Sequence, residues 1–146
     1  MTIFTDGGAR GNPGPAAVGV VIEDTKGQTI YTLGEPIGDT TNNIAEYTAV
    51  LRALEWIRAY PRSLTASEKI QFYLDSELVC RQLRGEYKVK NAGLQGLYYT
   101  IQQVGKPFHQ QITYTHIPRE KNKRADALVN QSLDTGQKLS YNKFDA

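Results

Sequence analysis

Apolar, β-branched segments occupy the first part of this sequence, and helix-like segments come only after them. Strands are predicted at residues 2–5, 17–23 and 28–34, each bounded by glycine, proline or charged residues. The segment 11–15 (Gly-Asn-Pro-Gly-Pro) is predicted to be a turn, because glycine and proline disfavour both regular structures. Three consecutive strands joined by short turns predict an antiparallel meander at the start of the fold.

Strands and helices alternate in the rest of the chain. A helix is predicted at 44–59, because residues 41–43 offer an N-cap, apolar residues recur near helical spacing and Pro61 ends the pattern. The later elements are a strand at 70–74, helices at 77–84 and 94–104, a strand at 111–116 and a helix at 121–133. This order is typical of an α/β fold with a mixed sheet and helices on its faces.

The length of 146 residues corresponds to about one domain, and no repeat or low-complexity linker divides it. We expect residues 1–134 to form this domain and the polar residues 135–146 to form a C-terminal tail. Apolar residues make up 40% of the chain and charged residues 22%, a balance that argues against disorder.

Composition also limits the environment of the chain. Its longest apolar stretches are too short to cross a bilayer, and Asp6 interrupts the apolar segment of any secretory leader, so we expect no membrane partner. The single cysteine, Cys80, excludes an internal disulfide and a cysteine metal cluster within the chain. This cysteine usage fits the reducing cytoplasm, which is the expected location.

Four acidic residues stand at the ends of predicted elements. Asp6 and Asp75 directly follow apolar strands, whose carboxyl ends commonly hold ligand sites in α/β sheets. Glu46 and Asp126 lie in the first turns of predicted helices, next to alanines. If the four carboxylates converge, their charges repel, and two divalent cations such as Mg²⁺ or Mn²⁺ would relieve the repulsion and promote phosphoryl transfer. Alternatively, Asp6 and Asp75 only cap turns and helices, and spacing alone leaves both interpretations open.

Two basic clusters stand on a chain that is otherwise nearly neutral, with 17 basic and 15 acidic residues. One spans residues 81–90 and the other residues 116–124. They either contact a polyanion such as nucleic acid or form ordinary solvated surfaces, and charge alone does not decide between these interpretations.

Four motifs together resemble those of type 1 ribonuclease H (ribonuclease HI). They are TDGGARGNPGP at 5–15, TNNIAE at 41–46, DS at 75–76 and HIPREKNKRAD at 116–126, and their order and separations match that family over about residues 1–134. The resemblance implies a ribonuclease H-like fold, with a five-stranded mixed sheet of three antiparallel and then two parallel strands and helices on both faces. It also implies a monomeric endonuclease that hydrolyses the RNA strand of RNA–DNA hybrids and leaves 5′-phosphate and 3′-hydroxyl ends.

The resemblance assigns catalytic roles residue by residue. Asp6 would bridge two Mg²⁺ ions, for which Mn²⁺ is expected to substitute, and Asp126 would hold the ion that activates water. Glu46 and Asp75 would complete the coordination of the second ion, on the side of the leaving group. His116 and Arg119 both lie in a loop where related proteins place an assisting residue, and which of the two assists stays open.

The resemblance also indicates a surface for the duplex. The turn at Gly11 and Asn12 exposes backbone groups that can bond to a 2′-hydroxyl, which only RNA offers. Asn42 and Asn43 add side-chain amides that can both donate to it and accept from it, and they could also cap a helix. Thr41 would belong to a phosphate pocket for the DNA strand. The full predicted set of substrate-binding residues is Gly11, Asn12, Thr41, Asn42, Asn43, Glu77, Arg81, Arg84, Lys88, Lys90 and Asn122.

Two departures from the family pattern affect these expectations. Glu77 stands where relatives often carry a glutamine that touches the 2′-hydroxyl, and a glutamate can accept but not donate. Only residues 85–91 connect two helices between which some relatives insert a basic, tryptophan-bearing handle. The single tryptophan, Trp56, falls instead in the helix that carries Glu46, where we expect it to pack in the core. The handle-less form resembles the archaeal-type subgroup.

Three alternatives to the hybrid-specific nuclease follow from the same residues. The chain could be a catalytically idle module that binds RNA–DNA or other duplexes, although four repelling acids would then have no use. It could be a broader nuclease that also cuts double-stranded RNA. It could also be a DNA-cleaving enzyme of the same superfold, since fold does not fix function.

Overall fold

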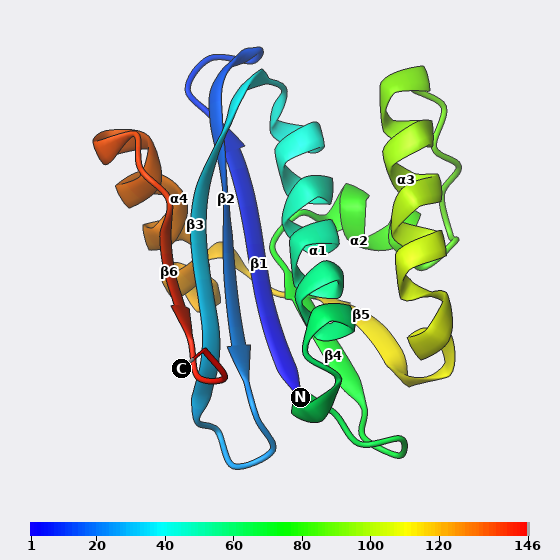
Figure 1. The fold of residues 1–146 in the computed structure, drawn as a ribbon. Coiled ribbons are helices and arrows are strands. Elements are labelled where there is room, and N and C mark those ends of the chain that lie inside the picture. The colour runs from blue at the N-terminus through cyan, green and yellow to red at the C-terminus, as the bar shows by residue number, and fades with distance from the viewer. Residues whose placement is uncertain (146) are drawn as a thin grey trace.

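The computed structural model describes residues 1–145 and contains one six-stranded mixed sheet with helices on both faces (Figure 1). The strand order is β5-β4-β1-β2-β3-β6; β1 pairs in parallel with β4, and β4 with β5, while β1, β2, β3 and β6 pair antiparallel. The strands are β1 (Thr2–Ala9), β2 (Gly14–Glu23), β3 (Thr29–Thr40), β4 (Ile70–Leu74), β5 (Ile112–His116) and β6 (Leu139–Asn142).

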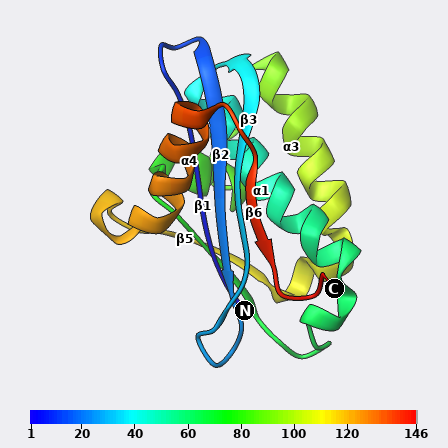
Figure 2. The same ribbon diagram turned by 60° about the vertical axis from the view of Figure 1, so that its left-hand side comes forward.

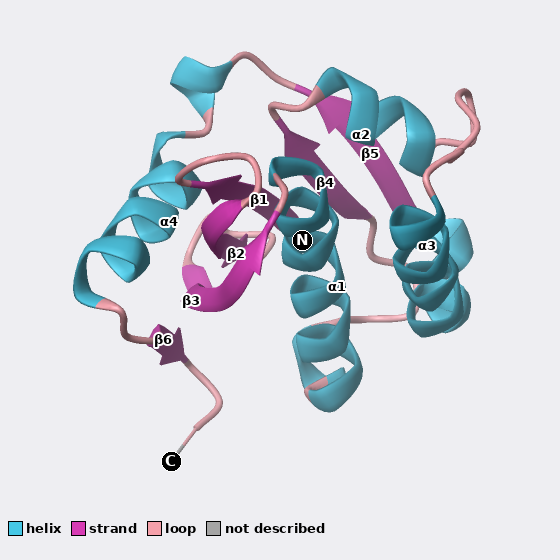
Figure 3. Cartoon of the chain, turned by 90° about the horizontal axis from the view of Figure 1, so that it is seen from above, coloured by secondary structure: helices cyan, strands magenta, loops and turns pink. Residues whose placement is uncertain are grey.

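Helix α4 covers β1, β2 and β3 on one face of the sheet, and α1 covers β1 and β2 on the other, where α3 packs against α1 (Figures 2 and 3). The helices are α1 (Asn42–Ala59), α2 (Glu77–Leu83), α3 (Ala92–Gly105) and α4 (Lys123–Thr135), with short 3₁₀ turns η1 (Pro61–Ser63), η2 (Lys106–Gln111) and η3 (Arg119–Lys121). No helix within residues 1–145 has the length and apolar character that a membrane span requires.

Local sequence explains where the helices begin. The Thr41 hydroxyl accepts a hydrogen bond from the Ile44 amide at 3.2 Å, and the Ser76 hydroxyl accepts one from the Val79 amide at 3.3 Å. Such N-caps satisfy amide groups that have no partner within the helix. These two caps fix the starts of α1 and α2, which lie next to the predicted acids.

The core lies between the sheet and α1. Val18, Val20 and Ile22 alternate along β2 and belong to one buried cluster with residues of α1 such as Leu54 and Ile57. Because successive strand residues point to opposite faces, the intervening positions of β2 face α4. Trp56 is 5% exposed and belongs to the same cluster, so the predicted core packing of this tryptophan is confirmed.

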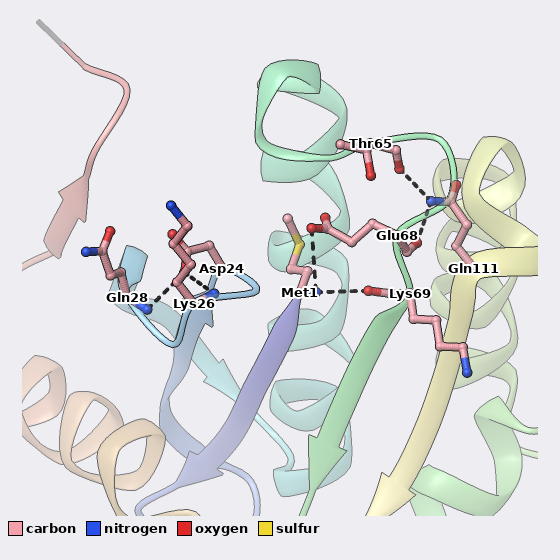
Figure 4. A network of polar contacts seen from close by, with 8 residues as sticks. All are labelled: Met1, Asp24, Lys26, Gln28, Thr65, Glu68, Lys69 and Gln111. Carbon is pink, nitrogen blue, oxygen red and sulfur yellow. Dashed lines mark hydrogen bonds and ion pairs between the residues drawn. The ribbon is translucent and has the colours of Figure 1, made fainter.

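Polar contacts close the amino ends of the parallel strands (Figure 4). The Met1 amino group donates to the Lys69 carbonyl at 3.0 Å and lies 4.0 Å from a carboxylate oxygen of Glu68 (Figure 4). The Gln111 amide donates to the Thr65 and Glu68 carbonyls at 3.1 and 2.7 Å (Figure 4). These contacts join the segments that precede β1, β4 and β5, and the predicted acids lie away from them, toward the carboxyl end of β4.

Several strand predictions need correction. Strand β2 begins at Gly14, inside the predicted turn at 11–15, and β3 continues to Thr40 rather than ending at Gly34, because residues 14–17 pair with residues 36–40. Strand β1 does not stop before Asp6 but continues to Ala9, because every residue from Thr2 to Ala9 pairs with β2. The segment predicted as a polar tail contains β6, whose residues pair with 31–34 of β3, so the sheet has six strands rather than five. Phe144 then packs near the Trp56 and Tyr60 rings, with centroids 6.0 and 6.3 Å apart. Strand β6 itself, Leu-Ser-Tyr-Asn, is a short edge strand, and the partly buried aromatic ring of Phe144 comes only after it. The four residues of the strand are therefore too few to show an alternation of apolar and polar residues strong enough to predict it.

Candidate active site

Three carboxylates meet where the middle of β1 passes the carboxyl end of β4. One carboxylate oxygen from each of Asp6, Glu46 and Asp75 lies within 4.8 Å of the other two. Asp6 and Glu46 are 6% and 7% exposed, and Asp75 is half-buried. All three line a cavity of about 430 Å³, and Asp126 lies on the wall of the same cavity. The structure thus clusters three of the four predicted acids and places the fourth beside them.

Close backbone contact positions Glu46 beside Asp6. A Cβ atom built on Gly7 would lie 2.2 Å from the carbonyl carbon of Ala45, so only glycine lets the first turns of α1 rest on β1 at this point. Asp6 precedes Gly7 in β1, and Glu46 follows Ala45 in α1. The two carboxylates are therefore brought together by the neighbouring backbones rather than by flexible side chains.

Burial and mutual repulsion shift the protonation of this cluster. Burial, and then the charge of Asp75, raise the pKa of Asp6 from 3.8 to about 7. Burial, and then the charge of Asp6, raise the pKa of Glu46 well above its ordinary value. Glu46 Oε2 is buried without a hydrogen-bond partner in residues 1–145. Buried oxygen ligands of like charge, one of them unsatisfied, form a donor set that suits a hard divalent cation.

Asp126 completes the acidic wall from the other face of the sheet. It lies in the first turn of α4, and its charge adds to the rise in the pKa of Asp6. It does not belong to the group whose oxygens lie within 4.8 Å of one another. It is half-buried and lines the cavity from α4, which covers the face of the sheet opposite α1.

The structure separates the two candidate assisting residues. Arg119, in η3, lines the cavity together with the four acids. His116 is exposed at the end of β5 and does not line this cavity. Arg119 is therefore the one that can bring a positive charge to the acids without a rearrangement of the loop.

Comparisons with known proteins decide the family. A family model described as reverse transcriptase-like matches residues 4–132. Ribonuclease HI of Halobacterium salinarum is 38% identical over 131 residues, which cover 90% of this chain and 63% of that protein. Ribonuclease H of Polaromonas sp. is 34% identical, with 92% of this chain and 88% of that protein covered. The chain belongs to the ribonuclease H family.

Solved structures of ribonuclease H agree with this membership. LC11-RNase H1, isolated from compost by a metagenomic approach, matches with a TM-score of 0.87 and 47% identity over 92% of this chain and 96% of that chain. The same enzyme in complex with an RNA/DNA hybrid gives a TM-score of 0.86. The expected ribonuclease H-like fold is confirmed, with six strands in this chain. The chain spans less than two thirds of the length of the Halobacterium relative.

Within this ribonuclease H fold, two asparagines tie the turn after β1 to the start of α1. The side-chain oxygen of Asn42 accepts from the backbone N–H of Ala9 at 2.8 Å, and the backbone N–H of Asn42 donates to the side-chain oxygen of Asn12 at 3.0 Å. The helix cap itself is Thr41, so capping does not account for Asn42. The side-chain NH₂ groups of Asn12 and Asn42 form no hydrogen bond within residues 1–145. Asn42 and Asn43 line the cavity, and Gly11 belongs to the same exposed turn as Asn12.

The basic residues of the 81–90 cluster differ in whether they form ion pairs within the chain, and its two arginines do. Arg81 Nε lies 3.0 Å from Glu77 Oε1, and Arg81 also pairs with Glu86 at 3.3 Å. Arg84 pairs with the same Glu86 at 2.7 Å. Glu77 is accordingly turned toward Arg81, and none of these side chains lines the cavity of the acids. Two of the four predicted phosphate contacts thus already have internal counter-ions.

The two lysines of this cluster differ from the arginines. Lys88 and Lys90 are exposed and form no ion pair within the described part of the chain. They lie in the connection between α2 and α3. In this chain they are the basic residues of the cluster whose charge is open to a polyanion.

Asn122 requires a correction. It was predicted to bind substrate, but its side chain is 1% exposed, so a duplex has no direct path to it. Its NH₂ group donates to the Thr5 carbonyl at 2.9 Å and to Asp75 Oδ2 at 3.3 Å. Sequence proximity to Asp126 suggested a surface loop, whereas the chain folds this residue under the site.

Arg10 and Asn130 are among the residues of the cavity wall that sequence reasoning did not select. Arg10 lines it and pairs with Asp134 at 2.7 Å, and Asn130 lines it from α4. Asn130 stands four residues after Asp126, a spacing that places both side chains on one helix face. That spacing was the available signal for Asn130.

Proposed function

We propose that this protein is an endonuclease that hydrolyses the RNA strand of RNA–DNA hybrids. The observation that carries the proposal is the cluster of Asp6, Glu46 and Asp75, whose oxygens lie within 4.8 Å of one another in a cavity. Support comes from LC11-RNase H1, which is 47% identical and has been solved with an RNA/DNA hybrid. The proposed products carry 5′-phosphate and 3′-hydroxyl ends.

We also propose that two Mg²⁺ ions, or Mn²⁺ in their place, act at this site. Asp6, Glu46, Asp75 and Asp126 would hold them, since all four are hard oxygen donors on one cavity. When bound, such ions supply an activated water and neutralise the charge that develops on the leaving oxygen. The unpartnered, buried Oε2 of Glu46 supports the fit, because a cation would give this oxygen the partner that the protein does not.

The chain's own residues would bind and orient the duplex. Arg119 brings a positive charge to the cavity wall, where it can attract the phosphate next to the cleaved bond. The NH₂ groups of Asn12 and Asn42 are free to donate to the 2′-hydroxyls of the RNA strand. Lys88 and Lys90 would contact phosphates farther along the duplex.

The test is a cleavage assay on three labelled duplexes, RNA–DNA, RNA–RNA and DNA–DNA, each with Mg²⁺, Mn²⁺ or a chelator. We expect the RNA strand of the hybrid to be cut with either cation and left intact with the chelator. Binding of the hybrid without cleavage would overturn the proposal in favour of an idle module. Cleavage of DNA–DNA would assign the chain to the DNA-cleaving enzymes of this superfold, and equal cleavage of RNA–RNA would replace hybrid specificity by a broader ribonuclease.

A further inference from the structure

Asn122 is hydrogen-bonded to two of the four acids and to the residue that precedes a third. Its side-chain NH₂ group donates to the carbonyl of Thr5, the residue before Asp6, and to Asp75 Oδ2. Its backbone carbonyl accepts from the amide of Asp126 at 3.1 Å. One buried residue therefore contacts the β1 backbone next to Asp6, the Asp75 side chain and the Asp126 backbone.

The orientation of the Asn122 amide follows from its neighbours. Thr5 and Asp75 both present oxygen atoms, which are acceptors, so the NH₂ group must face them. The opposite atom, Asn122 Oδ1, is then buried without a partner in residues 1–145. Native proteins rarely leave a buried polar atom unsatisfied, and those that remain call for an explanation. Here the explanation is that the two hydrogen bonds from the NH₂ group to Thr5 and Asp75 fix the orientation of the amide.

Asp75 receives this hydrogen bond while it lies among carboxylates of like charge. It is half-buried, and it lies within 4.8 Å of two other carboxylates whose charges repel it. Among the described residues, Asn122 provides the one hydrogen bond that its carboxylate accepts from a side chain. A lysine or arginine at position 122 would hold it too, but would neutralise it and compete with a cation. A neutral donor fixes the carboxylate and leaves its charge available.

We infer that Asn122 is a positioning residue that holds the Asp75 carboxylate toward Asp6 and thereby raises the affinity of the acidic cluster for its cation. The inference rests on the proposed function, because it assumes that the cluster binds a divalent cation. It replaces the direct contact with substrate that the sequence predicted for Asn122. Partners that orient metal ligands in this way typically contribute about 10- to 100-fold to metal affinity.

The experiment compares the binding of Mg²⁺ and Mn²⁺, by titration calorimetry without substrate, to the wild type, Asn122→Ala and a matched control, Ser132→Ala. Ser132 is also fully buried and donates to a backbone carbonyl, that of Gln137, at 3.1 Å, but it does not line the cavity. We expect Asn122→Ala to weaken cation binding by about 10- to 100-fold and Ser132→Ala to leave it unchanged. The Mg²⁺ concentration for half-maximal cleavage should rise by the same factor, and saturating Mg²⁺ should restore part of kcat.

Asn122→Ser keeps a donor and serves as the second variant if Asn122→Ala does not fold; it should bind cations more weakly than the wild type. Unchanged cation affinity in a folded Asn122 variant, or an equal loss in Ser132→Ala, would overturn the inference. The proposed function fails separately, because in that case the wild type itself neither binds Mg²⁺ nor cleaves hybrid.

Discussion

Gly19 of β2 lies directly against the carbonyl oxygen of Ala125 in α4: a Cβ atom built on Gly19 would stand 2.1 Å from that oxygen. Gly19 is also the register partner of Asp6 on β1, and Ala125 precedes Asp126. Because Gly19 has no side chain, α4 can approach the sheet beside Asp6. This contact places Asp126 on the cavity that holds the other acids.

Replacing Gly19 by alanine is expected to damage both stability and cleavage. The new methyl group meets backbone, which cannot move aside as a flexible side chain can, and overpacking of this kind typically costs about 1–3 kcal/mol. Displacement of α4 moves Asp126, so cleavage of hybrid should fall by more than the fraction of unfolded protein explains. Thermal unfolding and kcat on the same preparation measure the two effects.

The matched control is Gly96→Ala, because position 96 lies in α3 with no atom within 4 Å of an added Cβ. Alanine is the better helix former by about 1 kcal/mol, so this variant should be as stable as the wild type or more so, with unchanged cleavage. A Gly19→Ala enzyme with wild-type Tm and kcat would show that the close contact does not position α4.

Asp6→Asn should abolish cleavage while the hybrid still binds. Asparagine keeps the shape of the side chain but removes one of the charges that hold the cation, and we expect kcat to fall by about 10³-fold. The metal-free variant should be at least as stable as the wild type, since one repelling, buried carboxylate is gone. Single-turnover cleavage and hybrid binding in chelator test the two parts, and near-normal turnover would contradict the assignment of Asp6.

The metal-free protein should lose stability as the pH rises from 5 to 8. The pKa of Asp6 is about 7 in the folded protein and 3.8 in its ordinary state, so between these values the folded chain binds more protons than the unfolded chain. Stability then falls with increasing pH, and the raised pKa of Glu46 acts in the same direction. Each unit of difference corresponds to about 1.4 kcal/mol, so Tm in chelator should be at least about 3 °C higher at pH 5 than at pH 8.

Two additions check the origin of this pH dependence. Saturating Mg²⁺ should raise Tm most at pH 8, where the carboxylates are ionised and their repulsion is greatest. Asp6→Asn should flatten the dependence measured in chelator. A Tm that increases from pH 5 to pH 8 without metal would contradict the raised pKa values.

The sequence predicted those features that depend on local chemistry. The cap at Thr41, the strand at 70–74 before Asp75 and the helix that carries Asp126 are set by neighbouring residues. The cap and the strand lie where they were expected, and the helix lies two residues later, at Lys123–Thr135. The burial of Asn122 depends on contacts with Thr5 and Asp75, 117 and 47 residues away, which no local pattern reveals.

The same limit explains the other differences. Strand β6 exists because it pairs with β3, more than 100 residues earlier, and its own four residues show no alternation strong enough to predict it. The charge of Arg84 was visible in the sequence, whereas its ion pair with Glu86 depends on the turn that ends α2. Long-range pairing and the choice of ion-pair partner are tertiary properties, and family resemblance supplies the fold but not these details.

The salt dependence of hybrid binding should depend on the lysines of the 81–90 cluster more than on its arginines. Lys88 and Lys90 are exposed without an internal counter-ion in the described residues, so replacing both by alanine should reduce the slope of log K against log salt by up to about 2. Arg84→Ala should reduce it by less than about 1, because Glu86 already neutralises this side chain. Lys26→Ala, in the turn between β2 and β3, is the control and should leave the slope unchanged. Equal slopes for the wild type and the double lysine variant would mean that the cluster is only a solvated surface.

Arg119 rather than His116 should assist cleavage. Arg119 lines the cavity of the acids, whereas His116 is exposed at the end of β5 and does not line it. A hydrogen bond from a charged donor is worth about 1.5–3 kcal/mol, so Arg119→Ala should lower kcat/KM on hybrid by about 10- to 100-fold, and His116→Ala by less than about 3-fold. Arg119→Lys keeps the charge but loses the planar guanidinium, which can donate two parallel hydrogen bonds. Its kcat/KM should fall between those of the wild type and Arg119→Ala.

All variants are compared at saturating Mg²⁺ and fixed salt, so that cation affinity and general electrostatic attraction do not contribute. A larger loss in His116→Ala than in Arg119→Ala would reverse the assignment, and would require the β5 end to move toward the acids when the duplex binds.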